Sequence, residues 1–255
     1  MTRPRSRRRF GKPLGRLISL VSAYLLLTCL GHHLLWPEAA PAATEMPQDG
    51  DVLVNRIAGE RITFVQARRS SSADAVVLAV ELQPGGAIPY PHVHGGTLET
   101  FEVVEGELTM RVDGVDHHLK AGQHLAVEPG LSHQPRNDSG KPVRVKVTLD
   151  PNANLDLCLV QLHSFMDDPE RTKNPLTMGL QMVALSDAYD VQLPMVPVWM
   201  QRAATFLAAP TARLLGYRSW QADYLAHAHE RGIAATNAVV DPAAEVKPTG
   251  LKGGS

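Results

Sequence analysis

The chain has 255 residues, 44% of them hydrophobic, and a formal net charge of −1 at pH 7. Residues 1–43 carry seven basic residues and one acid, which leaves a net charge of −7 on the rest of the chain. This acidic body excludes nucleic acid as the expected partner, because phosphate binding requires a basic surface. The length allows one sizeable core with a small appendage.

The N-terminal segment, residues 1–43, has the layout of a secretory signal. A basic stretch precedes an apolar run, and small residues follow with an A-x-A site at residues 40–42. The stretch SRRRFGK, residues 6–12, resembles the twin-arginine export signal of bacteria and departs from it at Gly11. A cleaved signal predicts a periplasmic or extracellular protein. The alternative is an uncleaved membrane anchor, since a span needs about 20 mostly apolar residues.

Residues 50–162 show the period-two pattern of strands. Short runs rich in Val, Leu, Thr and Phe, such as RITFVQA, TFEVVEG and VRVKVTLD, recur at a spacing of roughly 8–12 residues. The dipeptide Asp113-Gly114 is a hairpin signal, because both residues tolerate positive φ. Short strands at regular spacing predict an all-β core in the form of an antiparallel sandwich or barrel.

Helical spacing follows the strands. Residues 174–191 place apolar side chains three and four positions apart, and Pro197 is a good first-turn residue for a second helix. We expect a small α-helical C-terminal extension over residues 163–235 that caps the β-domain or pairs it with a second copy. The alternative for these helices is a membrane-surface or partner role. Residues 236–255 are rich in Ala, Pro, Gly and Lys and are expected to be disordered.

Four side chains suggest a metal site. Residues i and i+2 of a strand share a face, so His92 and His94 lie side by side. Glu99 falls on the face of Phe101, an expected interior position, and a buried carboxylate is costly unless it is paired or binds a cation. His133, after a tight turn, supplies a third imidazole. Three histidines and a glutamate suit one divalent transition metal (Fe, Mn, Cu, Ni or Zn) and are too rich in nitrogen for Ca or Mg.

These residues fall in two recognisable motifs. Residues 86–106 read G-(x)5-H-x-H-(x)4-E-(x)6-G, and residues 122–137 read G-(x)5-E-x-G-(x)2-H-(x)3-N. The first matches the first cupin motif at every fixed position, and the second matches the second motif except that Glu128 replaces proline. Over about residues 50–162 the chain resembles the type-2 (conserved-barrel) cupins of bacteria. The resemblance implies a double-stranded β-helix, or jelly-roll barrel, with the metal inside and with His92, His94, Glu99 and His133 as ligands.

Side chains next to the ligands are expected to line the pocket. Tyr90 lies just before His92, Gln134 directly follows His133, and Phe101 shares the inward face of Glu99. Five other histidines are expected to take no part in the site: His117, His118, His124, His227 and His229.

Two functions of different classes fit such a site. An open position on the metal could hold O2, water or a chelating substrate, which predicts a metal-dependent enzyme with dioxygenase-like oxidation of a small organic molecule. No second acid–base pair is evident in the sequence, which favours chemistry done by the metal. The alternative is a non-catalytic exported barrel that binds a small molecule or stores metal. The sequence leaves the oligomeric state open; the resemblance makes a homodimer possible, because cupin barrels often pair through their sheet edges, and the helices offer another surface.

Overall fold

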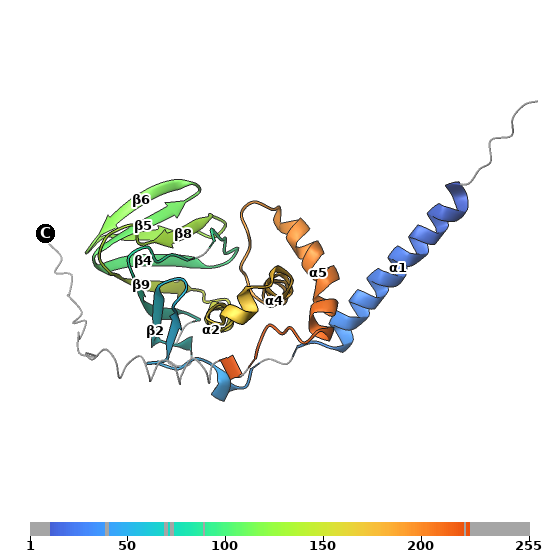
Figure 1. Ribbon diagram of the computed structural model, residues 1–255, viewed down its shortest axis with the longest axis horizontal. Helices are drawn as coiled ribbons and strands as arrows, with labels where there is room; N and C mark the ends of the chain where they lie inside the picture. Colours follow the sequence, from blue (N-terminus) through green and yellow to red (C-terminus); the bar gives the residue numbers. More distant parts are fainter. Residues whose placement is uncertain are drawn as a thin grey trace, which may run out of the picture.

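The computed structural model describes residues 11–224, apart from residues 39, 40, 69, 70, 72, 73, 89 and 222. Figure 1 shows two facing β-sheets, helices gathered on one side of them, and a long N-terminal helix that projects away. Most of the twin-arginine-like stretch, the predicted tail, and His227 and His229 lie outside the described residues.

The larger sheet has six strands in the order β1-β2-β3-β9-β4-β7, and neighbouring strands run antiparallel. The strands are β1 (Val52–Asn55), β2 (Glu60–Gln66), β3 (Val76–Leu82), β4 (Leu98–Glu105), β7 (His124–Val127) and β9 (Val143–Asp150). Strand β9 pairs with β3 on one side and β4 on the other. The last strand in the sequence therefore lies in the middle of the sheet, between β3 and β4.

The smaller sheet has three strands in the order β6-β5-β8 and faces the larger one (Figure 1). Its strands are β5 (Glu107–Val112), β6 (Val115–Lys120) and β8 (His133–Arg136). The β5–β6 hairpin turns at Asp113 and Gly114, whose φ angles are 46° and 82°. Such angles match the twist of the flanking strands, so the predicted hairpin is confirmed.

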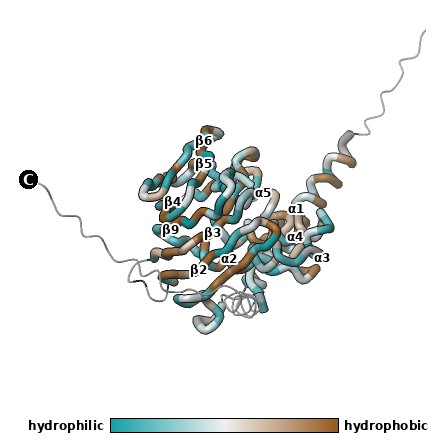
Figure 2. Tube along the Cα trace, turned by 60° about the vertical axis from the view of Figure 1, so that its left-hand side comes forward, coloured by the Kyte–Doolittle hydropathy of each residue, from teal (hydrophilic) through white to brown (hydrophobic). Residues whose placement is uncertain are grey.

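Alternating side chains build the core between the two sheets. On β9 the valines at 143, 145 and 147 are buried, while Arg144 and Lys146 are exposed. Strand β4 buries Glu99, Phe101 and Val103 on one face. Figure 2 shows the resulting alternation of apolar and polar residues along the strands. The predicted all-β core with jelly-roll architecture is confirmed.

A helix that the sequence did not predict closes one side of the barrel. Helix α2 (Leu155–Met166) follows β9, and its residues 155–162 fall in the range that the sequence assigned to strands. Leu155, Val160 and Phe165 join the barrel core, whereas Leu157 and Cys158 pack with residues of α4. Because α2 is buried on two sides, its sequence lacks a polar face, and an apolar run of this kind has no clear helical period.

Three further helices follow α2. They are α3 (Pro169–Thr172), α4 (Pro175–Ala188) and α5 (Val198–Leu214), so helices occupy both stretches where the sequence predicts them. The Asn174 side chain caps α4 by accepting a hydrogen bond from the Leu176 N–H at 2.9 Å. Helices α4 and α5 pack against each other, beside α2 (Figure 1).

Helix α1 (Gly11–Leu35) is long and apolar enough over Leu14–Leu35 to cross a membrane, by length and composition only. Its C-terminal end contacts α5. The His33 Nε2 atom lies 3.0 Å from the Phe206 carbonyl oxygen, and the two rings stack with centroids 4.7 Å apart. The Cys29 side chain is buried at the same contact.

Candidate metal centre

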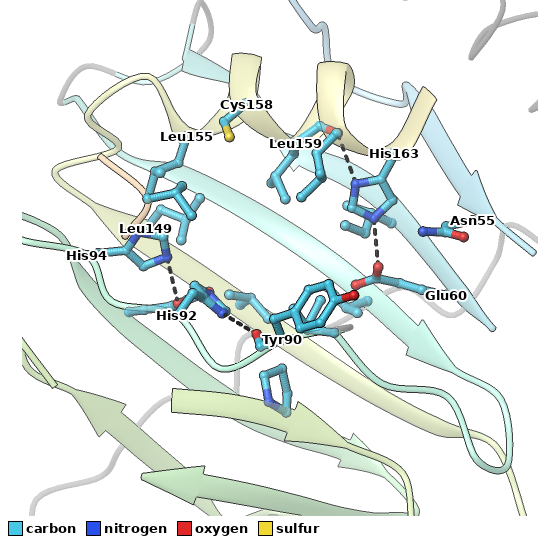
Figure 3. Close-up of a pocket in the computed structure, with 18 of the residues that line it drawn as sticks. Asn55, Glu60, Tyr90, His92, His94, Leu149, Leu155, Cys158, Leu159 and His163 are labelled. Carbon is cyan, nitrogen blue, oxygen red and sulfur yellow. Dashed lines mark hydrogen bonds and ion pairs between the residues drawn. The ribbon is translucent and has the colours of Figure 1, made fainter. Parts of the chain in front are cut away.

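A cavity of about 370 Å³ lies between the inner face of the larger sheet and helices α2 and α4. Most of its wall is aliphatic, from side chains of β3, β9 and α2. Figure 3 shows His92 and His94 on one side of this cavity, with Leu155 of α2 near His94. Its volume falls within the range of small-molecule sites, about 300–1,000 Å³.

Backbone pairing brings the two sequence motifs together. The His92 N–H donates to the His133 carbonyl at 3.1 Å, and the His133 N–H donates back at 2.9 Å. Gly130, with φ of 88°, donates its N–H to the His94 carbonyl at 2.8 Å. Glu128, the departure from the second motif, is exposed. The turn before His133 therefore forms without the usual proline.

The four predicted ligands converge. One ligand atom from each of His92, His94, Glu99 and His133 lies within 4.8 Å of all the others. The Nε2 atom of His133 is 2.8 Å from Oε2 of Glu99, and Nε2 of His94 is 3.7 Å from the same oxygen. His92 is half-buried, and the other three side chains are buried.

Backbone carbonyls fix the orientation of all three imidazole rings. The Nδ1 atoms of His92, His94 and His133 lie 3.3, 2.7 and 3.2 Å from the carbonyl oxygens of Tyr90, Asp190 and Leu131, respectively. A carbonyl oxygen only accepts hydrogen bonds, so each Nδ1 carries a hydrogen when the ring is neutral. The lone pair then resides on Nε2, which faces the cluster. A hydrogen bond from the other ring nitrogen to a backbone carbonyl is typical of histidines that bind metal.

Electrostatics put two of the four side chains, His92 and Glu99, in the protonation states that bind metal. Desolvation, together with the neighbouring His133 and His94, lowers the pKa of His92 to about 3. Burial by itself would raise the pKa of Glu99, but the hydrogen bond and charge of His133 lower it overall. At neutral pH His92 is thus a neutral imidazole and Glu99 a carboxylate, the protonation states that bind metal. Burial opposes the charged form of His133, but its hydrogen bond to Glu99 raises its pKa overall, so a metal would displace the proton of that hydrogen bond.

The donor set fits one divalent transition metal. Three oriented imidazole nitrogens and a carboxylate oxygen face one another inside a buried cluster, and a cation would satisfy them all. Nitrogen-rich sets of this kind suit iron, manganese, copper, nickel or zinc.

The predicted pocket residues behave differently from one another. Tyr90 and Phe101 line the cavity, Tyr90 at an exposed position and Phe101 within the core. Gln134 does not line it. Its side-chain amide instead donates to the Ile88 carbonyl at 2.7 Å, because inward and outward positions alternate on β8 and Gln134 follows the inward His133. The side chains of His117, His118 and His124 are exposed, away from the cluster.

Two groups of residues near the site were missed from the sequence. Asp190, between α4 and α5, supplies the carbonyl that orients His94, and its Oδ2 accepts the Gly96 N–H at 2.8 Å. A main-chain contact leaves no signature in a sequence. Glu60 and His163 form a buried pair that also lines the cavity. The period-two pattern of β2 places Glu60 on the buried face. A carboxylate at such a position was the one feature of the sequence that could have pointed to this pair.

We expect Asp190→Ala to weaken metal binding by about ten- to hundredfold, the usual cost of losing a group that holds a metal ligand in place. The carboxylate accepts the Gly96 N–H and so ties the loop that carries His94 to the extension. Its removal is expected to loosen the backbone carbonyl of residue 190, which orients the His94 ring. A competition titration with a chromophoric zinc chelator measures the effect. Asp187→Ala is the matched control, because Asp187 pairs with Arg213 at 2.6 Å and lies outside the cavity wall. Equal affinities in the two variants would contradict the expectation.

Comparison with known proteins identifies the domain. Residues 78–150, well under half of the chain, match the family described as Cupin domain. This segment contains all four clustered residues but neither Glu60 nor His163. A search of curated proteins gave no match.

Similar solved structures include the Cupin_2 domain of an XRE family transcriptional regulator from Enterobacter cloacae, at 24% identity over 36% of this chain and 95% of that one, with a TM-score of 0.32. A predicted oxalate decarboxylase from Thermotoga maritima is 18% identical over 44% of this chain and 97% of that one, with a TM-score of 0.35. Scores this low carry no inference about this chain. The assignment as a cupin fold rests on the family match and the strand topology.

Proposed function

We propose that this barrel holds one divalent transition metal and acts on a small organic molecule by dioxygenase-like oxidation. The convergence of three Nε2 atoms and one carboxylate at the wall of a cavity of about 370 Å³ carries the proposal. When bound, the metal would supply an open position for O2 or a chelating substrate.

The residues of the chain have defined parts in this proposal. His92, His94, His133 and Glu99 hold the metal, and the carbonyls behind the rings keep each Nε2 directed inward. The aliphatic side chains of β3, β9 and α2 keep bulk water from the bound substrate, which strengthens polar interactions within the site. A substrate that coordinates through oxygen is thereby held beside the open position.

Elemental analysis of the full chain, beside a His92→Ala/His133→Ala variant, tests the metal site. The expected result is about one metal per chain in the wild type and loss of that metal in the variant. Circular dichroism confirms that both proteins are folded. A wild-type protein without metal, purified from its own host fraction, would refute the proposal.

The second candidate is a non-catalytic barrel that binds a small molecule or stores metal. It is retained because, among the described residues, the side chains of the cluster bond only to one another and to backbone carbonyls. The native metal separates the candidates. Iron, manganese or copper with oxygen consumption supports the enzyme, whereas zinc supports the binding barrel.

We also propose that the N-terminal helix stays attached as a membrane anchor. The segment at its end docks onto the extension: Glu38 accepts the Ser219 N–H at 3.1 Å, and His33 contacts Phe206. Cleavage at the A-x-A site would remove this docked segment and expose the α5 surface beneath it.

Fractionation of cells that express the chain with a C-terminal epitope tests the anchor. The full-length protein is expected in the membrane fraction, resistant to a carbonate wash. A shortened, soluble protein outside the cytoplasm would instead show a cleaved signal. Arg7→Lys/Arg8→Lys should block export in either case if the twin-arginine route is used.

A further inference from the structure

A second polar group faces the same cavity. Glu60 on β2 and His163 on α2 are 2% and 4% exposed, and His163 Nε2 lies 2.7 Å from Glu60 Oε2. Both line the cavity, whose wall is otherwise largely apolar. Figure 3 shows this pair on one side of the cavity and His92 and His94 on the other.

The hydrogen bonds of the pair define its protonation. The Nδ1 atom of His163 lies 2.9 Å from the Leu159 carbonyl, which can only accept, so Nδ1 carries a hydrogen. One further proton lies between Nε2 and Glu60 Oε2. Whether it resides on nitrogen or oxygen, the pair as a whole is neutral. The Oε1 atom of Glu60 has no hydrogen-bond partner among the described residues and remains an acceptor.

Holding α2 on the barrel does not require such a pair. Buried ion pairs are costly to desolvate, and apolar side chains of similar volume often stabilise as well or better. Helix α2 already has a charged tether outside the cavity wall, where Arg68 binds Asp156 at 2.5 Å. The pair is a hydrogen-bonding group across an apolar cavity from His92 and His94 (Figure 3). It suits a ligand that carries a polar group at the corresponding end.

We propose that the Glu60–His163 pair is a second binding site for the substrate and that Glu60 Oε1 accepts a hydrogen bond from a substrate hydroxyl. The substrate class is an apolar molecule with a metal-coordinating oxygen group at one end and a hydroxyl at the other. The metal-binding end of this description rests on the proposed function. A neutral hydroxyl fits better than an ammonium or carboxylate, because a charged group would leave net charge in the neutral, apolar pocket.

Isothermal titration calorimetry with model ligands tests the proposal. The probes are octanoate and decanoate, each with its ω-hydroxy derivative, titrated into the full chain loaded with zinc. For at least one chain length the hydroxylated probe is expected to bind about tenfold tighter, the scale of one hydrogen bond to a charged group. In Glu60→Leu/His163→Phe, which replaces both partners by apolar groups, the preference should reverse in favour of the plain acid.

Asp156→Asn is the matched control, because it perturbs a buried pair on α2 that does not line the cavity, and it should keep the wild-type preference. The proposal is overturned if no hydroxylated probe is preferred, if the double variant keeps the preference, or if none of the probes binds. Titrations without metal separate this proposal from the proposed function. Suppose that the hydroxylated probes are still preferred but that zinc increases the affinity of none of them. This result would support hydrogen bonding of the hydroxyl to Glu60 and would refute coordination of the other end of the ligand by the metal.

Discussion

Replacing Glu99 with glutamine is expected to reduce metal affinity by at least about 100-fold, beyond the range seen when only a residue that supports a metal ligand is replaced. The carboxylate is the anionic donor in a cluster with three imidazoles, and its Oε2 lies between His133 and His94. The amide keeps the size of the side chain but loses the charge that offsets the cation. Metal content after dialysis and a chelator competition titration measure the loss.

Glu102→Gln is the matched control for this substitution. Glu102 lies on the same strand with its side chain on the outer face, 3.4 Å from Lys146, and 52% of that side chain is exposed. An exposed ion pair contributes at most about 1 kcal/mol, so both metal content and folding should stay close to wild type. Retention of stoichiometric metal by Glu99→Gln would show that Glu99 is not a ligand.

The Glu60–His163 pair gives the second large effect, on stability. Glu60→Leu alone leaves His163 without its buried partner and is expected to reduce the free energy of unfolding by about 3–5 kcal/mol. The double substitution Glu60→Leu/His163→Phe should cost far less, because it leaves no unpaired polar group. Urea unfolding at pH 6 measures both. Similar losses in the single and double variants would contradict the expectation.

The stability that the pair provides should also depend on pH. Burial opposes the charged form of His163, but the Glu60 carboxylate raises its pKa above the usual 6.5. A group whose pKa is raised by folding stabilises the protein fully below its unfolded pKa, and that contribution is lost as the pH rises through the folded value. The difference in unfolding free energy between wild type and the double variant should therefore shrink above about pH 6.5.

The fold and the four clustered residues could be read from the sequence for a physical reason. Strand period alone places Glu99 on the buried face of β4, and the unusual cost of a buried carboxylate points to a cation. The turn before His133 and the spacing of His92 and His94 follow equally local rules. Local sequence patterns were therefore sufficient to predict the four clustered residues.

What the sequence did not reveal depends on distant contacts. Glu60 and His163 are 103 positions apart, and each looks ordinary in its own segment. Helix α2 has no polar face because it is buried on two sides, so its period is hidden. Gln134 was expected in the pocket from its place beside a ligand, although neighbours on a strand point to opposite faces.

Strands and helix contribute unequally to the proposed pocket. The metal-facing side chains belong to paired segments of the barrel, where any change disturbs strand register. Leu155, Leu159 and Leu162 of α2 form part of the opposite wall and take part in no strand pairing. Evolution, or a library of variants confined to these positions, can therefore change the range of molecules admitted without altering the reactive centre.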